Sequence, residues 1–185
     1  MTFAVYDTNV LVSAFWTPQG KASALLREVI SGKITLCYDA RILFEYQDVL
    51  LRPKFRFSES MVSSILDFIQ TSGLSVTPPT VSNMHFPDEI DRAFFEVARF
   101  CNAPLVTGNL KHYPMDPMIK TIADFYDMHI LHRSDTASSK VLQAQSSDDN
   151  VPLRPFGETQ DALKQNVFAD AEDRAEIERL GGKAR

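Results

Sequence analysis

The stretch FAVYDTNVLVSA, residues 3–14, decides the fold. Its first four residues are apolar, as in a short buried strand. Three polar residues follow, Asp7, Thr8 and Asn9, and the chain then continues as the apolar side of a short helix. A buried strand that passes through a polar turn into a helix is typical of an α/β domain and places Asp7 at the carboxyl end of the strand.

The same alternation continues along the chain. Further strands are predicted at 34–38, 74–77 and 104–107, with a last strand and helix within 120–128. Helices are predicted at 22–30, at 41–51 behind an Asp39 cap, from Ser58 to Gly73, and at 88–101. Short strands alternating with helices predict a parallel sheet flanked by helices on both faces, a three-layer α/β/α fold. The strand order does not follow from this pattern.

Composition suits one globular α/β domain with a tail. The chain has 185 residues, of which 44% are hydrophobic and 23% are charged. After about His132 the sequence becomes rich in Ser, Asp and Gln, so we expect the folded domain to span residues 1–133. Residues 134–185 are expected to form a linker and a C-terminal tail that is flexible or binds a partner.

The chain carries no signal for a membrane or for export. No apolar run reaches the roughly 18 residues of a membrane-spanning helix, and the N-terminus lacks the basic start of a signal peptide. The two cysteines, Cys37 and Cys101, stand in apolar segments and are expected to be free thiols. We therefore expect a cytoplasmic protein. The net charge of −5 does not by itself indicate a nucleic-acid binder.

Three acidic residues are the candidates for chemistry. Asp7 follows the first strand, Glu45 stands in the middle of the helix predicted at 41–51, and Asp91 lies in the opening turn of the helix at 88–101. Carboxylates that converge in one cleft repel one another and require a cation, and Mg²⁺ or Mn²⁺ prefers such oxygen ligands. Such ions promote in-line displacement at a phosphodiester. Four polar residues are candidate supporting groups or substrate contacts: Thr8, Asn9, Thr107 and Asn109.

Each acid also has an ordinary structural explanation. Asp7 could cap the helix that follows it. Asp91 could complement a helix dipole, and Glu45 could pair with Arg41 one turn earlier on a solvated face. For each acid considered by itself, the sequence spacing leaves these alternatives open.

The chain resembles the PIN-domain family in four motifs that occur in the family's order. They are FAVYDTNVLVSA at 3–14, ILFEYQDVL at 42–50, DEIDRAFFEVA at 88–98 and LVTGN at 105–109. The similarity covers about residues 3–130 and is closest to the branch of VapC-like ribonucleases, the toxin components of bacterial toxin–antitoxin pairs. In these motifs Asp7, Glu45 and Asp91 stand where the family has its acidic residues.

This resemblance implies a PIN fold and a Mg²⁺- or Mn²⁺-dependent endonuclease that cleaves single-stranded RNA. It also implies a homodimer that a small antitoxin protein inhibits. One position departs from the family pattern, because Asn109 replaces the usual aspartate after Thr-Gly. Asparagine offers a carbonyl oxygen but no charge, so metal binding should be weaker, particularly at a second site.

Substrate contacts and competing functions remain open. The basic residues Arg52, Lys54 and Arg56 alternate with phenylalanines and could hold phosphates and stack bases, and Lys111 lies just beyond Asn109. A charged loop is more often only a solvated surface. A PIN module that binds RNA or a protein without cleavage is the main alternative. A phosphatase of the haloacid dehalogenase type is disfavoured, since Asn9 occupies the position of its second aspartate.

Overall fold

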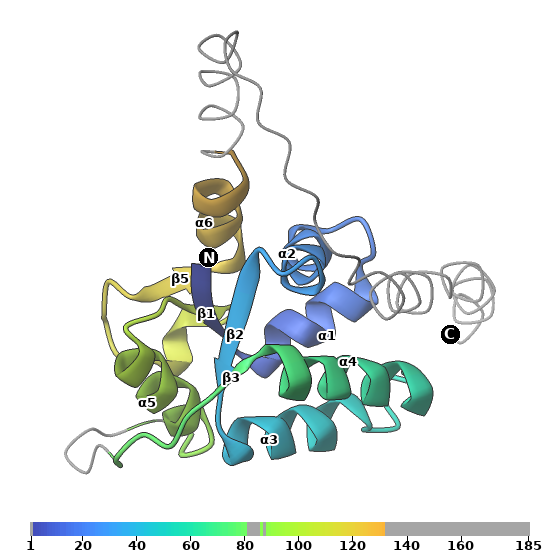
Figure 1. Cartoon of the computed structure of the whole chain (residues 1–185), viewed down its shortest axis with the longest axis horizontal. Coiled ribbons are helices and arrows are strands. Elements are labelled where there is room, and N and C mark those ends of the chain that lie inside the picture. Colours follow the sequence, from blue (N-terminus) through green and yellow to red (C-terminus); the bar gives the residue numbers. More distant parts are fainter. Residues whose placement is uncertain (1, 81–85, 87, 132–185) are drawn as a thin grey trace, which may run out of the picture.

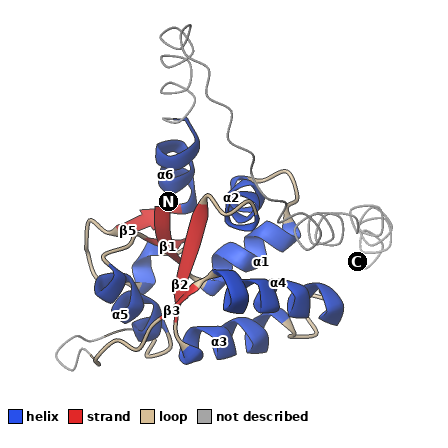
Figure 2. Ribbon diagram, in the orientation of Figure 1, coloured by secondary structure: helices blue, strands red, loops and turns tan. Residues whose placement is uncertain are grey.

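The computed structural model describes residues 2–80, 86 and 88–131. Within this part the strands are β1 (Thr2–Tyr6), β2 (Ile34–Tyr38), β3 (Leu74–Ser75), β4 (Leu105–Thr107) and β5 (Ile119–Thr121). The helices are α1 (Thr8–Trp16), α2 (Lys21–Ile30), α3 (Ala40–Leu50), α4 (Glu59–Ser72), α5 (Asp91–Cys101) and α6 (Ile122–Tyr126). A 3-10 turn at Leu110–His112 follows β4, and a π-helical turn at Asp127–Leu131 follows α6 (Figures 1 and 2).

The strands form one parallel sheet in the order β3-β2-β1-β4-β5. The chain adds β2 and β3 on one side of β1 and then returns to add β4 and β5 on the other. The point where the order reverses therefore lies between β1 and β4, where Val5 pairs with Leu105 and Tyr6 with Val106. In open α/β sheets, ligands bind outside the carboxyl ends of the strands at such a reversal.

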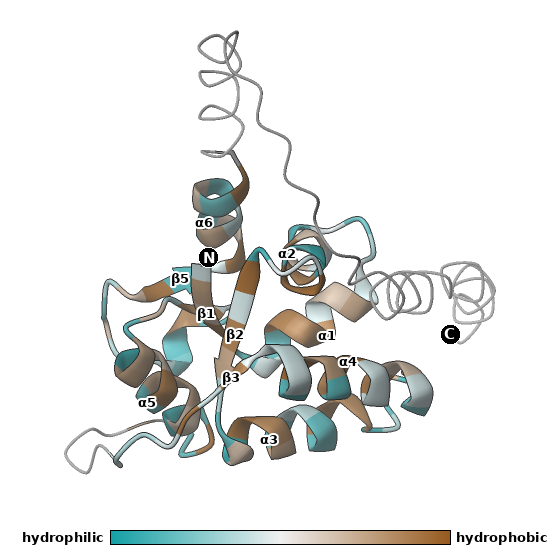
Figure 3. Cartoon of the chain, viewed as in Figure 1, coloured by the Kyte–Doolittle hydropathy of each residue, from teal (hydrophilic) through white to brown (hydrophobic). Residues whose placement is uncertain are grey.

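Helices cover both faces of the sheet, as the sequence predicts. Figure 1 shows α5 on one side of β1 and β2, and α1 and α2 on the other. Helix α5 packs on β1, β2 and β4, while α2 packs on α1, β2 and α6. Along α3, α4 and α5 hydrophobic and hydrophilic residues alternate (Figure 3), because each helix has one buried face. The predicted three-layer α/β/α fold is thus confirmed.

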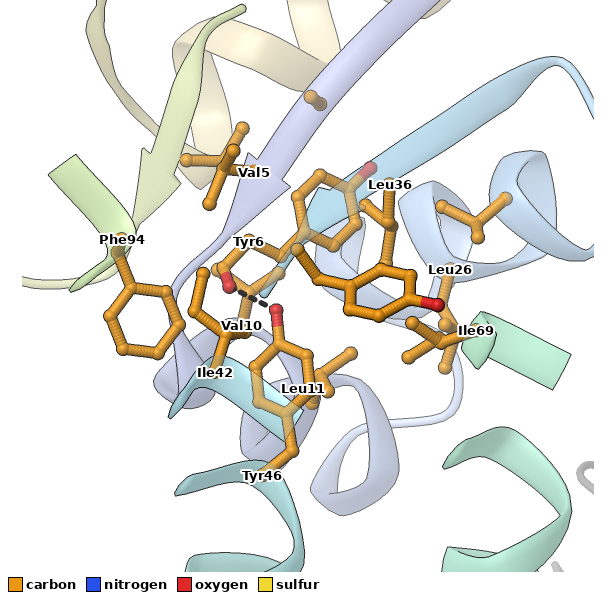
Figure 4. Close-up of a cluster of buried hydrophobic side chains, with 14 of the residues drawn as sticks. Val5, Tyr6, Val10, Leu11, Leu26, Leu36, Ile42, Tyr46, Ile69 and Phe94 are labelled. Atoms are coloured by element: carbon orange, nitrogen blue, oxygen red, sulfur yellow. Dashed lines mark hydrogen bonds between the residues drawn. The ribbon is translucent and has the colours of Figure 1, made fainter. Parts of the chain in front are cut away.

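The core is continuous through the sheet and ties α3 to β1. Tyr6, Leu36 and Tyr46 are all at most 2% exposed. The Tyr46 hydroxyl donates a hydrogen bond to the carbonyl oxygen of Tyr6 (Figure 4), the residue immediately before Asp7. A buried hydroxyl needs such a partner. The bond therefore fixes α3, which carries Glu45, against the strand that carries Asp7.

Two predicted elements are shorter than expected. The helix predicted at 88–101 begins at Asp91, because residues 88–90 form a turn in which the Asp88 carboxylate accepts the Ile90 N–H at 3.0 Å. The strand predicted at 74–77 is restricted to Leu74–Ser75. It lies at the edge of the sheet, and the two prolines that follow at 78–79 have no N–H to extend the pairing.

The predicted linker and tail at 134–185 lie outside the described residues, so the domain boundary near 133 stays a prediction. Among the residues that the structure does describe, no helix is long and apolar enough to cross a membrane.

Candidate active site

Asp7 lies where β1 ends and α1 begins, and it is 6% exposed. Its Oδ2 accepts three hydrogen bonds: from Thr107 Oγ1 at 2.7 Å, from Asn9 Nδ2 at 2.7 Å and from the Tyr113 hydroxyl at 3.1 Å. Among the described residues, its Oδ1 accepts only the Asn9 backbone N–H, at 3.3 Å, so Asp7 also caps α1. One carboxylate oxygen is therefore held by three side chains, and the other is left with a single long contact.

The ends of β1 and β4 interlock around Asp7. Asn9 Oδ1 accepts the Gly108 N–H at 2.7 Å, and Thr107 Oγ1 accepts the Asn109 N–H at 2.9 Å. A Cβ added to Gly108 would lie 3.1 Å from Asn9 Oδ1, so glycine allows this close approach. The structure thus brings together four predicted residues, Asp7, Asn9, Thr107 and Asn109.

Asp91 approaches the same place from α5. It stands in the first turn of that helix and is 8% exposed. Burial, followed by the negative charge of Asp7, raises the pKa of Asp91 to about 6. Its Oδ2 lies 3.0 Å from His112 Nδ1, and the charge and hydrogen bonding of His112 offset part of this rise in pKa. Apart from this contact, the buried oxygen has no hydrogen-bond partner among the described residues.

Glu45 faces this region from the middle of α3. Its pKa is raised chiefly by burial, with contributions from the charges of Asp48, Asp7 and Asp88, while Arg52 lowers it. The structure does not bring Glu45 into direct contact with the other two acids. Across residues 2–80, 86 and 88–131, no group of three or more acidic, histidine or cysteine side chains is close enough to hold a metal ion together. A shared three-carboxylate site therefore stays a prediction.

The alternative pairing of Glu45 with Arg41 is wrong. Arg41 instead contacts Asp39 Oδ2 at 2.6 Å and Glu96 Oε2 at 2.7 Å. Glu96 is 1% exposed, so Arg41 balances a buried charge of α5 and joins that helix to the start of α3. Glu45 is thereby left without its i−4 partner. It lies beside Asp7 and Asp91, whose immediate surroundings we call the acidic pocket.

The other predicted site residues, Thr8 and the four basic residues, lie in different surroundings. Thr8 is 5% exposed, and its hydroxyl has no hydrogen-bond partner in the described structure. Arg52 is bound to Asp48 at 2.6 Å and is not free for a phosphate. Lys54 Nζ lies 4.7 Å from the centre of the Phe55 ring, and Arg56 and Lys111 are exposed. Lys111 stands in the 3-10 turn next to His112, close to the acidic pocket.

Tyr113 was not anticipated from the sequence. It is 7% exposed, and burial together with the charges of Asp7 and Asp91 raises its pKa, so it remains a neutral donor to Asp7. His112 lies beside it, with Nδ1 3.0 Å from Asp91 Oδ2. Both follow β4 through the 3-10 turn at Leu110–His112. That turn, which has no apolar periodicity to reveal it, returns the chain to the pocket.

Comparison with known proteins agrees with this geometry. Residues 4–111 match the PIN domain family, a span that holds Asp7, Glu45, Asp91 and Thr107. An uncharacterized protein of Methanocaldococcus jannaschii, MJ1680, is 32% identical over 108 residues, which are 57% of this chain and 69% of the relative. PIN domains are typically nucleases and generally use divalent metal ions. Because this match covers more than half of its length, the chain belongs to the PIN domain family.

Proposed function

We propose that the protein is a metal-dependent endoribonuclease that hydrolyses phosphodiester bonds of single-stranded RNA. The observation that carries the proposal is the pair of buried carboxylates, Asp7 and Asp91, at the point where the strand order reverses. Two nearby carboxylates repel one another and are unfavourable in a structure unless their negative charge has a function or a counter-ion.

The donor set fits a divalent cation with oxygen ligands. Among the described residues, Asp91 Oδ2 is buried with His112 Nδ1 at 3.0 Å as its one close partner, and Asp7 Oδ1 has a single contact, at 3.3 Å. Asp7 and Asp91 would therefore hold Mg²⁺ or Mn²⁺, with Glu45 as a further ligand or as the group that orients water. When bound, such an ion lowers the pKa of water and stabilises charge on a phosphodiester undergoing in-line displacement.

The side chains around the two aspartates have separate tasks. Thr107, Asn9 and Tyr113 fix the orientation of Asp7 by holding its Oδ2. Glu45, whose pKa is raised, is suited to accept a proton from the water that attacks phosphorus, after which the P–O bond to the leaving oxygen breaks. Thr8, Asn109 and Lys111 border this centre and are proposed substrate contacts.

The biological setting is also a proposal. The four ordered motifs resemble the toxin components of toxin–antitoxin pairs, which supports a cytoplasmic homodimer inhibited by a small antitoxin protein. The tail at 134–185 is available in the sequence as an additional partner-binding segment.

A second candidate function is a PIN module that binds RNA or a protein without cutting. Asn109 favours it, because the side chain after Thr-Gly brings no charge to the pocket. The lack of a three-ligand group in the described residues points the same way.

The deciding experiment compares cleavage and metal binding in matched variants. Wild type, Asp7→Asn, Asp91→Asn and the exposed control Asp67→Asn are incubated with single-stranded RNA and Mg²⁺ or Mn²⁺, and Mn²⁺ binding is measured by calorimetry. We expect wild type and Asp67→Asn to cut RNA and bind Mn²⁺, and both site variants to lose cleavage. Equal cleavage by all four proteins would identify a contaminating nuclease. Metal binding without cleavage by wild type would favour the non-cutting module.

A further inference from the structure

A partly exposed cluster of aromatic rings, in which Phe55 and Phe57 are half-buried, lies at the end of α1 opposite Asp7. Trp16 is the last residue of α1 and is 57% exposed. Its ring stands edge-on to Phe55, with centroids 5.8 Å apart, and to Phe57, with centroids 6.2 Å apart. Phe55 and Phe57 are stacked, 5.5 Å apart and inclined by 6°. We call Trp16, Phe55 and Phe57 the aromatic platform.

The aromatic platform is anchored to the core. Phe57 is edge-on to Phe15 at 5.3 Å, and Phe15 is only 3% exposed. Arg56, which separates Phe55 from Phe57 in the sequence, has a φ of 54°, which is unusual for a residue other than glycine. The rings are therefore held in a defined arrangement although Trp16 remains open to solvent. A rigid, exposed aromatic surface is suited to stacking a flat ligand.

Cationic side chains border the aromatic platform. Residues 51–60 contain three basic side chains and one acidic side chain, Glu59. Arg52 is neutralised by Asp48, but Lys54 lies over Phe55, and Arg56 is exposed beside it. Lys54 and Arg56 thus place positive charge next to the rings. This combination of aromatic faces and cations is typical of surfaces that bind single-stranded nucleic acid.

The position of the platform fits a strand that also reaches the acidic pocket. Helix α1 has nine residues, Asp7 caps its first turn and Trp16 is its last residue. At a rise of 1.5 Å per residue the helix is about 13 Å long. Asp7 and Trp16 therefore stand at opposite ends of a short helix, a separation that a few nucleotides of an extended strand can span.

We propose that the aromatic platform, with Lys54 and Arg56, binds single-stranded RNA next to the scissile bond by stacking bases and holding phosphates. The choice of RNA as ligand rests on the proposed function, whereas the surface itself rests on the ring geometry and charge. An apolar peptide would gain nothing from the two cations, while an RNA strand uses both the rings and the charges.

The test measures RNA binding without cleavage. Trp16 is the only tryptophan of the chain, so its fluorescence reports directly on the platform. The full-length protein in EDTA is titrated with oligouridylate of about 12 nucleotides, within the site size of single-strand binders. We expect saturable quenching of Trp16, and an affinity that falls as the salt concentration rises because phosphate contacts release counter-ions.

Variants assign the binding to the platform. Binding of fluorescently labelled oligouridylate is compared for Phe55→Leu, for the double variant Lys54→Gln/Arg56→Gln and for the control Lys33→Gln. Lys33 immediately precedes β2, at the amino end of that strand, and pairs with Glu28. We expect the Phe55 variant to bind at least about 5-fold more weakly, as for loss of one stacked base. The double variant should also bind more weakly with a reduced salt dependence, and Lys33→Gln should match wild type.

The outcomes separate this inference from the proposed function. Unchanged affinity in both platform variants would overturn the inference, even if the protein cuts RNA. Burial of Trp16 in a dimer of this chain, shown by concentration-dependent fluorescence without RNA, would overturn it as well. Weaker binding by both platform variants would support the inference, including when the wild-type protein shows no cleavage with Mg²⁺ or Mn²⁺. The double variant alters only exposed side chains, so loss of folding in Phe55→Leu leaves the test intact.

Discussion

The hydroxyl of Thr107 donates a 2.7 Å hydrogen bond to Asp7 Oδ2, joining residues that are 100 positions apart in the chain. The bond crosses the boundary between β1 and β4, where the strand order reverses. The same Thr107 oxygen accepts the Asn109 N–H at 2.9 Å and the Asn9 side-chain amide at 3.2 Å. One fully buried hydroxyl therefore connects both strand ends to the acidic residue of the pocket.

Thr107→Val should weaken both folding and metal binding. The substitution keeps the shape of the side chain but removes a hydrogen bond to a carboxylate and leaves the Asn109 N–H without its acceptor. We expect a loss of about 1–3 kcal/mol in the free energy of unfolding, measured with urea. Mn²⁺ affinity, measured by calorimetry, should also fall because Asp7 loses one of the groups that orient it.

Thr71→Val is the matched control for this experiment. The Thr71 hydroxyl bonds only to carbonyl oxygens of its own helix, those of Asp67 and Phe68. Its loss should change stability by less than the Thr107 substitution and should leave Mn²⁺ affinity unaltered. If the two valine variants lost the same free energy of unfolding and the same Mn²⁺ affinity, the hydrogen bond from Thr107 to Asp7 would have no specific role in metal binding.

Asp91→Asn should stabilise the metal-free protein above about pH 6. The folded-state pKa of Asp91 is about 6, raised from an ordinary value of 3.8, mainly by burial. Between these values the folded protein binds more protons than the unfolded chain, so its stability falls as the pH rises through this window. Asparagine removes the charge, and the gain at neutral pH is up to about 3 kcal/mol.

Urea unfolding in EDTA at several pH values between about 4 and 8 measures this effect. The difference between Asp91→Asn and wild type should grow from about pH 4 to about pH 6 and then level off. Asp67→Asn, on the exposed side of α4, should follow the wild-type curve. A difference that does not change with pH would show that Asp91 titrates as an ordinary exposed carboxyl group.

The local features of the fold could be predicted from sequence because they depend on neighbours in the chain. Asp39 caps α3 and Ser58 caps α4 as the sequence indicates. The strand at Ile34–Tyr38 has the predicted bounds because all five residues are buried. Asp7 both caps α1 and belongs to the acidic pocket, so the two explanations of this residue were not exclusive.

The contacts that complete the site could not be predicted, because they join distant segments. Arg41 bonds to Glu96, 55 residues away, instead of to Glu45 in the next turn. Tyr113 reaches Asp7 over 106 residues. Trp16 is mainly exposed, and the rings beside it come from the loop after α3. Periodicity predicts which face of an element is buried, but the strand order decides which side chains meet.

Asn109→Asp tests the departure from the family pattern. Asn109 follows β4 and donates its backbone N–H to Thr107 Oγ1. Aspartate keeps this backbone hydrogen bond, so the substitution adds a charge and leaves the local backbone unchanged. A further carboxylate should strengthen Mn²⁺ binding or add a second ion to the calorimetric stoichiometry. RNA cleavage should increase in parallel. The exposed substitution Gln47→Glu adds the same charge on α3 and should change neither measurement. Unchanged metal binding in Asn109→Asp would show that this position lies outside the metal site.

Glu45→Gln separates catalysis from metal binding. Glu45 is half-buried on α3, faces the charges of Asp7 and Asp88, and lies outside any three-ligand group among the described residues. As the group that accepts a proton from water, it should contribute about 100-fold or more to the rate of RNA cleavage. Its loss should reduce Mn²⁺ affinity less than Asp7→Asn does. Asp67→Asn, an exposed change on α4, serves as the control and should cut RNA normally. Full activity of Glu45→Gln would remove this residue from the mechanism, and a loss of Mn²⁺ affinity equal to that of Asp7→Asn would make it a metal ligand.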